Sequence, residues 1–307
     1  MIATLLARQI IQLFIMMFCG FLMVRMKLLK ASDSKTLSIL VVYIICPCTV
    51  LNAFQIRYTP EIAGNFLLAA GAALLVHLVL YLMTLAMKKV FRLSDIERVS
   101  IMYSNAGNLV IPLVSAILGE EWVVYASAFM VVQLFIIWTH GKSLVEGKRG
   151  ADLKSILTNV NLLACVIGLT MFLLHMQLPG IVRDTVKSLG STVGPVGMLM
   201  IGMILGGLDL KAMVMDRRVW FVSFLKMIVS PLIILLVLKY SGLASLSADG
   251  QTILYISLLA TMTPVASTVT QMAQLYDKDV RYATALNTIT TLVCIGTMPL
   301  LTMLYYL

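Results

Sequence analysis

Apolar residues of this chain fall into ten long runs that are separated by short polar connections. Each run has roughly 17 to 25 residues, the length that an α-helix needs to cross the hydrocarbon core of a bilayer. The pattern therefore predicts an all-α integral membrane protein with ten transmembrane helices and no soluble domain. The approximate limits of the runs are 8–25, 36–55, 62–87, 98–118, 122–141, 158–176, 187–207, 218–239, 250–275 and 280–305.

Polar and helix-breaking residues interrupt two of these runs. In the fourth run residues 104–112 read SNAGNLVIP, and in the ninth run residues 261–268 read TMTPVAST. Gly and Pro break helical hydrogen bonding, and the backbone groups left over must be satisfied by protein, solute or trapped water, so neither segment can face lipid. Interrupted spans in corresponding halves of a chain point to the substrate site of a transporter.

The two interruptions occupy equivalent positions in two sets of five runs, residues 1–150 and 151–307. A shift of 157 residues places Gly107 on Pro264, although the identity between the two halves is weak. Because five is an odd number, the second set would cross the membrane in the opposite sense to the first. The sequence thus predicts two inverted five-helix repeats, with broken crossover helices in spans four and nine, within a single membrane domain.

Composition agrees with a membrane protein and excludes other classes. The chain is 60% hydrophobic and 12% charged, with a mean hydropathy of +0.98, which leaves too little polar surface to cover a soluble fold of 307 residues. The net charge of +9 does not indicate nucleic-acid binding, because the basic residues cluster in the connections that follow odd-numbered runs. The positive-inside rule then predicts both termini on the non-cytoplasmic side. The opposite side carries only Arg8, Arg57, Arg183, Lys187 and Lys239.

Motifs for catalysis, metal binding or ATP hydrolysis are absent from the sequence. Its three histidines form no His-Glu-x-x-His pattern, and it has no Gly-x-x-x-x-Gly-Lys-Ser/Thr loop. The five cysteines all lie in apolar runs, where a thiol is a small packing group, so we predict neither a disulfide framework nor a metal site. We therefore expect no enzyme and no cofactor.

The interrupted runs define the candidate substrate site. Broken helices bring N-termini, with unpaired N–H groups and the positive end of the helix dipole, to the middle of the membrane, where they favour an anionic ligand. Asn105 and Asn108 can offer amide donors to a carboxylate, or they only bond the broken backbone. Hydroxyls of the ninth run could complete the site, although such hydroxyls often bond their own helix. The predicted substrate-binding residues are Asn105, Gly107, Asn108, Pro112, Thr261, Thr263, Pro264 and Ser267.

Three polar side chains deep inside other runs are candidates for ion coupling or for support of the site. His77 in the third run could carry a coupling proton, because imidazole titrates near neutral pH; a neutral histidine packed between helices is the alternative. Gln133 lies in the fifth run. Lys226 lies in the eighth run, and we expect its ammonium group to reach the membrane interface in preference to attracting an anion at depth.

Several of these stretches resemble the auxin efflux carrier family, which includes plant auxin exporters and bacterial malonate and malate permeases. Residues 159–208 are similar to its sixth and seventh spans, although Val160 stands where the family has the proline of an Asn-Pro pair. Residues 104–112 resemble its fourth-span crossover, and Pro264 falls where the ninth-span crossover would be. The resemblance covers nearly the whole chain. It implies ten helices in two inverted repeats, divided into a scaffold or dimerisation part and a transport part.

Residues and resemblance together predict a secondary transporter that moves a small organic anion, such as a mono- or dicarboxylate, by alternating access at the crossover. A ligand-sensing receptor with the same site and a carrier like the sodium–bile acid symporters are the alternatives, because a shared fold does not name the substrate. The short connection 141–157 favours a prokaryotic inner-membrane protein over a plant exporter. A coupling H⁺ or Na⁺ and a homodimer are expected by analogy. Substrate, direction of transport and coupling ion stay open at this point.

Overall fold

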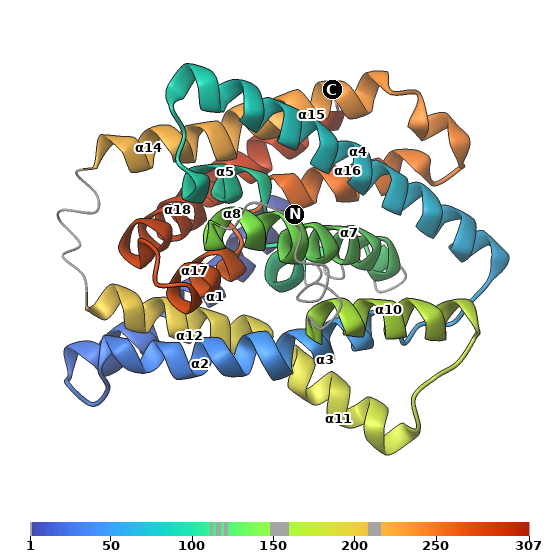
Figure 1. Cartoon of the computed structure of the whole chain (residues 1–307). Helices are drawn as coiled ribbons and strands as arrows, with labels where there is room; N and C mark the ends of the chain where they lie inside the picture. The colour runs from blue at the N-terminus through green and yellow to red at the C-terminus, as the bar shows by residue number, and fades with distance from the viewer. Residues whose placement is uncertain are drawn as a thin grey trace.

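The computed structural model of this chain is a bundle of α-helices (Figure 1). It describes residues 2–110, 113–114, 118–119, 122–147, 160–207 and 216–306. These residues contain no β-strand, which confirms the all-α class, and their β-pairing is limited to one isolated bridge. In the first half the α-helices are α1 (Ile2–Arg25), α2 (Ser34–Leu40), α3 (Cys46–Ala53), α4 (Pro60–Phe91), α5 (Asp95–Met102), α7 (Val123–Ile136) and α8 (Lys142–Glu146). In the second half they are α10 (Val160–Leu173), α11 (Gly180–Ser191), α12 (Val193–Gly206), α14 (Arg217–Phe224), α15 (Ser230–Tyr240), α16 (Gly250–Thr261), α17 (Ser267–Leu275) and α18 (Val280–Tyr306).

Several helical segments are long and apolar enough to cross a membrane. A bent pair, Val280–Cys294 and Gly296–Tyr305, is a sixth candidate beside five continuous ones. These six coincide with runs two, three, five, seven, eight and ten of the prediction. The fourth and ninth runs are interrupted, because α5 ends at Met102 and α16 ends at Thr261. The five continuous candidates are Ala31–Asn52, Pro60–Phe91, Val123–Glu146, Gly180–Gly206 and Arg217–Tyr240.

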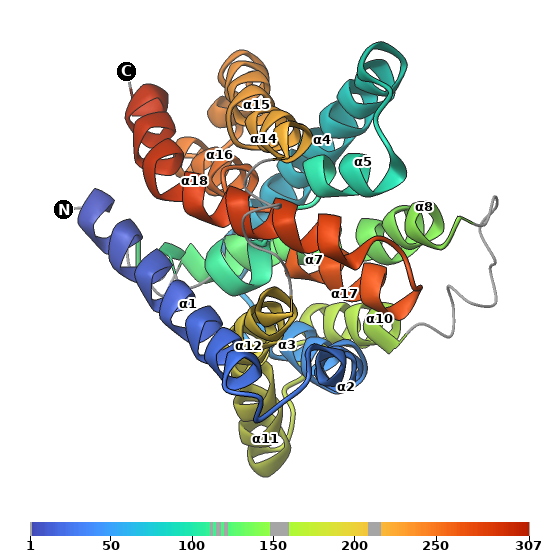
Figure 2. The ribbon, with the colours of Figure 1, turned by 90° about the vertical axis from the view of Figure 1, so that its left-hand side faces the viewer.

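The helices pack in two groups, which Figure 2 shows toward opposite ends of the molecule. In the first group α1 lies along α12, and α3 lies against α10 and α11. In the second group α4 lies against α7 and α16, and α14 lies against α18. Helix α17 contacts both groups, since it packs against α18 and also against α2 and α12. The interrupted ninth run is therefore part of the boundary between them.

One helical span on each side of this boundary contains a wider, π-helical turn shortly before a proline. Proline has no N–H, and its ring crowds the carbonyl group four residues earlier, so a regular α-helical turn before it is disfavoured. A π-helical turn, η2 (Val41–Ile45), precedes Pro47, and a second one, η6 (Leu225–Val229), precedes Pro231. Such turns are frequent at functional sites because they change the direction of single side chains. Lys226 belongs to η6 and is fully buried.

Glycines allow α1 and α12 to approach each other closely. A Cβ atom on Gly202 would clash with the backbone carbonyl of Met17, and one on Gly20 would clash with the carbonyl of Leu199. Small residues at such positions let the backbones of membrane helices touch and gain packing energy. The contact of α1 with α12 thus depends on glycine at these positions.

Gly202→Ala is expected to destabilise the folded protein, because the added methyl group forces α1 and α12 apart. Overpacking of this kind costs roughly 1–3 kcal/mol or more. The measurement is the thermal unfolding midpoint of the purified protein in detergent. Gly194→Ala is the matched control, since it lies in the same helix and its Cβ would meet no atom within 4 Å. An equal midpoint for the two variants would contradict the packing argument.

Candidate functional site

The two interrupted segments meet in the interior of the bundle. After α5 the chain runs extended before the π-turn η3 (Ala106–Val110), and after α16 it turns at Met262 and Thr263 and then runs extended before α17. Ser104 and Val265, both buried, form an antiparallel bridge between the two segments. Pro264 favours the break, because it donates no helical hydrogen bond and disfavours the helical conformation of the residue before it. Two backbone hydrogen bonds flank the bridge, from Asn105 N–H to the Pro264 oxygen (2.9 Å) and from Ala266 N–H to the Tyr103 oxygen (3.0 Å).

Side chains of α7 and α18 satisfy the backbone groups that the bridge leaves over. Gln133 of α7 accepts from the N–H of Ser104 at 3.0 Å and donates to its carbonyl oxygen at 2.7 Å. On the other segment Thr290 of α18 accepts from the N–H of Val265 at 3.1 Å, and Asn287 donates to its carbonyl oxygen at 2.8 Å. Each broken segment is thus held through both backbone groups of one residue. An unsatisfied group at this depth would cost several kcal/mol.

Lys226 lies behind the first segment. Its side chain is fully buried, and its ammonium group donates to the hydroxyl of Ser104 at 2.6 Å and to the carbonyl oxygen of Ile101 at 3.2 Å. The expectation that this group reaches the membrane interface is therefore wrong, because the π-turn η6 directs the side chain to the crossover. Among the described residues no carboxylate forms an ion pair with it. The site therefore contains a buried lysine amino group, and no carboxylate of the described residues is placed to balance its charge when it is protonated.

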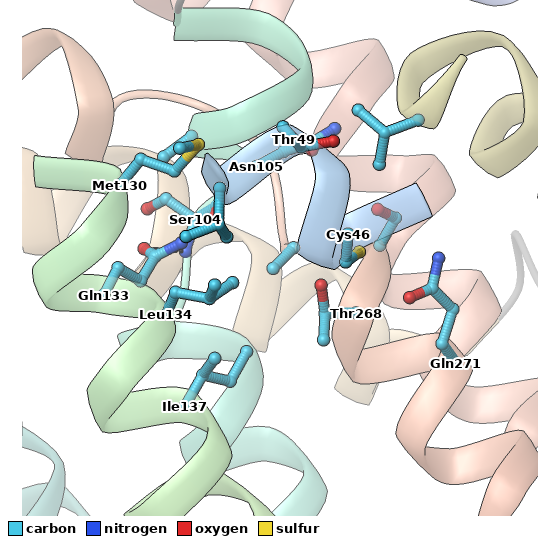
Figure 3. A pocket seen from close by; sticks show the side chains of 15 residues that line it. Cys46, Thr49, Ser104, Asn105, Met130, Gln133, Leu134, Ile137, Thr268 and Gln271 are labelled. Atoms are coloured by element: carbon cyan, nitrogen blue, oxygen red, sulfur yellow. Dashed lines mark hydrogen bonds between the residues drawn. The ribbon is translucent and has the colours of Figure 1, made fainter. Parts of the chain in front are cut away.

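A cavity of about 50 Å³ lies beside the crossover, between the two groups of helices (Figure 3). On this measure one water molecule needs roughly 10–15 Å³, so the cavity has room for a few water molecules. Of the predicted site residues, Asn105, Gln133 and Ser267 line it. Ser104 forms part of the wall, and its hydroxyl group accepts the hydrogen bond of Lys226, which does not itself line the cavity. The wall is completed by Cys46, Thr49, Val50, Ala106, Met130, Leu134, Ile137, Val193, Ala266, Thr268 and Gln271.

Other predicted residues lie at the crossover without lining this cavity. The hydroxyl of Thr261 donates to the Leu258 oxygen and that of Thr263 donates to the Ala260 oxygen, each at 2.7 Å and within its own helical segment. Pro264 contributes only its backbone oxygen. The backbone of Gly107 and Asn108 belongs to η3, whereas the Asn108 side chain and all of Pro112 lie outside the described part of the chain.

His77 is buried near the crossover but does not line the cavity. Its Nδ1 lies 2.7 Å from the backbone oxygen of Ala73, which makes Nδ1 the protonated nitrogen. Its Nε2 has no hydrogen-bond partner among the described residues. The ring packs against Phe129, with centroids 5.1 Å apart, and lies farther from Tyr103, at 6.3 Å. These contacts are those of a histidine packed between helices, with one ring nitrogen that forms no hydrogen bond to the described residues.

A polar network fixes the start of α5. Ser94 and Glu97 form a capping box, in which the Glu97 carboxylate accepts from the N–H of Ser94 at 2.6 Å. The same carboxylate accepts from Arg218 of α14 at 2.8 Å and from the hydroxyl of Tyr282 of α18 at 2.7 Å. The three helices are therefore joined at one buried carboxylate.

A second polar network fixes the start of α16. The amide of Asn65 in α4 donates to the carboxylate of Asp249 at 3.1 Å and to the hydroxyl of Tyr125 in α7 at 3.4 Å. The hydroxyl of Ser247 donates to the Asn65 oxygen at 2.7 Å. Here the acidic residue Asp249 is linked to a tyrosine on a neighbouring helix through the Asn65 amide, whereas Glu97 binds Tyr282 directly.

Sequence reasoning missed several residues of the site. Cys46 was expected to be a packing group, yet it lines the cavity, and Thr49 stands one turn further along α3. Pro47 between them is the signal in the sequence that this span is irregular. Gln271 is, like Gln133, an uncharged polar residue inside an apolar run, and this position could have marked it as a candidate. Asn287 and Thr290 could not be found from spacing alone, because only the fold brings them to Val265.

The described residues offer no metal chemistry at this site. No group of three or more His, Cys, Asp or Glu side chains among them is placed to hold a metal ion. The cysteines whose side chains the structure describes, Cys19, Cys46, Cys48 and Cys294, are free thiols. What the crossover offers to a ligand is hydrogen bonding, with the Lys226 amino group behind Ser104.

Apolar helices around an interior polar crossover define a multi-pass integral membrane protein. A protein-family model described as "membrane transport protein" matches residues 5–155 and 150–302. The chain therefore belongs to this family, the auxin efflux carrier family of membrane transporters, which are not enzymes. No curated protein matches the chain.

Proposed function

We propose that the protein is a secondary transporter that moves a small organic anion, a mono- or dicarboxylate, across the membrane by alternating access at the crossover. The observation that carries this proposal is the Lys226 amino group, which is buried, forms no ion pair with a carboxylate of the described residues, and donates to Ser104 in the cavity wall. A buried charge is costly unless it is balanced. An anion in the cavity would supply this balance.

The start of α17 adds to the attraction for an anion. Ser267 and Thr268, the first two residues of this nine-residue helix, line the cavity. The first turn of a helix carries partial positive charge and favours negatively charged groups. Asn105 on the opposite segment also lines the cavity and can donate its amide to a carboxylate without adding a fixed charge. Asn105, Ser267 and Thr268 are therefore the proposed contacts of the carboxylate.

We also propose that the chain consists of ten helices in two inverted repeats, residues 1–150 and 151–307. Gln133 and Thr290 are 157 residues apart, and each binds the backbone of one partner of the Ser104–Val265 bridge, whose two members are 161 residues apart. The separation of Gln133 and Thr290 equals the shift that aligns the two interruptions in the sequence. An inverted repeat supplies a natural basis for alternating access, since each half can take the conformation of the other.

The networks at the starts of α5 and α16 support the same proposal. Tyr125 and Tyr282 are also 157 residues apart, and each reaches the network at the start of a broken helix. In one network the acidic residue is Glu97, in the other Asp249. Two independent pairs of side chains thus follow one shift along the sequence, although the identity of the two halves is weak.

Orientation and coupling are part of the proposal. The distribution of Lys and Arg favours both termini on the non-cytoplasmic side of a cell membrane, the inner membrane in a Gram-negative cell. A coupling ion, H⁺ or Na⁺, is proposed by analogy with the resembling family, with His77, whose Nε2 has no partner among the described residues, as the candidate residue for H⁺. A homodimer is proposed by analogy with the resembling family.

Binding of the anion is tested by thermal unfolding of the purified protein with a panel of small mono- and dicarboxylates, with and without sodium and at two pH values. A ligand that binds the folded form raises the unfolding midpoint as its concentration exceeds its dissociation constant. We expect at least one carboxylate to do so, and Asn105→Ala to remove the shift while its midpoint without ligand stays near that of the wild type. No shift with any carboxylate, or an equal shift in Asn105→Ala, would overturn the assignment of the site.

A further inference from the structure

Gln271 presents an unsatisfied acceptor at the cavity. It lies on α17 four residues after Ser267, so the two side chains share one face of the helix, and both line the cavity. The residue is 1% exposed, and its Oε1 has no hydrogen-bond partner among the described residues. Figure 3 shows the oxygen of this amide turned toward the side of the cavity where Cys46 and Thr268 lie.

The other glutamine of the wall shows what a structural role would look like. Both ends of the Gln133 amide are used, because its oxygen and its nitrogen bind the two backbone groups of Ser104. Buried side-chain polar atoms nearly always have a partner, and one without a partner costs about 1–3 kcal/mol. The buried Gln271 oxygen therefore lacks a hydrogen-bond donor, and the described residues do not supply one.

We infer that Gln271 selects substrates by accepting a hydrogen bond from a hydroxyl or N–H group of the bound anion. The inference rests on the proposed function, in which the carboxylate lies at Asn105 and the start of α17. Gln271 stands about 6 Å further along the helix than Ser267, just over one turn, within reach of a second group on a small acid. An ionised carboxylate can only accept hydrogen bonds, so it cannot satisfy this oxygen. The preferred substrate carries a carboxylate and a donor group.

The test compares acids that differ by one hydroxyl group. Dissociation constants of malate and succinate, and of lactate and propionate, are measured by thermal-shift titration of the wild type, Gln271→Leu and Gln274→Leu. Gln274 is the matched control, because it lies on the same helix and outside the cavity wall. A lost hydrogen bond to a buried acceptor corresponds to roughly 10- to 100-fold in affinity.

We expect the wild type and Gln274→Leu to bind the hydroxy acid of at least one pair about 10- to 100-fold more tightly. Gln271→Leu should bind both members of that pair with the affinity of the unsubstituted acid. Equal binding of both members of each pair by the wild type would overturn the inference. An equal loss of affinity for both members in Gln271→Leu would also overturn it. Absence of binding by all four acids would instead contradict the proposed function, and the inference would fall with it.

Discussion

Lys226→Met is expected to reduce uptake of the transported anion about 10- to 100-fold and to raise the thermal unfolding midpoint. The uptake falls because the hydrogen bonds of a charged group, worth about 1.5–3 kcal/mol, are lost together with the positive charge behind Ser104. The midpoint rises because the wild type pays the desolvation cost of an ammonium group that the described residues do not pair with a carboxylate. Methionine fills a similar volume without that cost.

The two effects are measured separately on the same preparations, as initial uptake rates in proteoliposomes and as unfolding midpoints in detergent. Lys239→Met is the matched control, since Lys239 lies in the last turn of α15 and is exposed. It should leave both quantities unchanged. A lower midpoint together with full uptake for Lys226→Met would mean that Lys226 has a purely structural role.

Gln133→Leu is expected to lower the unfolding midpoint and to abolish uptake. It leaves the buried N–H and carbonyl group of Ser104 without partners, at about 1–3 kcal/mol each. The first crossover segment then no longer holds Ser104 in place between Lys226 and the cavity. Gln133→Glu keeps the acceptor for the N–H, and its carboxyl group can donate to the carbonyl group only in the protonated form, so its midpoint should lie between those of Gln133→Leu and the wild type.

The control for this prediction is Gln251→Leu, because Gln251 is exposed at the start of α16. Asn287→Leu tests the second segment in the same way, since it leaves the carbonyl oxygen of Val265 unpaired. If the two segments are equivalent halves of one site, both substitutions should stop uptake. Full uptake by Gln133→Leu would show that the backbone of the crossover does not depend on this side chain.

The fold class and the breaks in runs four and nine could be predicted because both depend on local physics. Apolar runs of spanning length and low charge allow only helices in a membrane. Pro264 disfavours a continuous helix in the ninth run, and the backbone indeed leaves the helix at Thr261. The position of Lys226 could not be predicted in this way. Its depth depends on a π-turn before Pro231 and on the packing of α14, η6 and α5.

Part of the site could be predicted because the helix breaks that form it are visible in the sequence. Asn105 and Ser267 lie in the broken segments and were found because the breaks are visible in the sequence. Thr261 and Thr263 lie in the same stretch, yet their hydroxyls bond their own helical segment, which spacing cannot reveal. Cys46 lies on α3, which only the tertiary fold brings to the crossover, whereas Gln271 lies on α17, one turn beyond the broken segment. A pattern shows where a helix breaks, whereas packing decides which side chains share the resulting space.

The central claim is that the cavity at the crossover carries a small organic anion across the membrane. Its most direct test is the uptake of the carboxylate with the largest thermal shift into proteoliposomes that contain the wild type or Asn105→Ala. The account predicts saturable uptake by the wild type and uptake by Asn105→Ala at the level of protein-free liposomes. Uptake by the wild type at that background level, or equal uptake by both proteins, would contradict it.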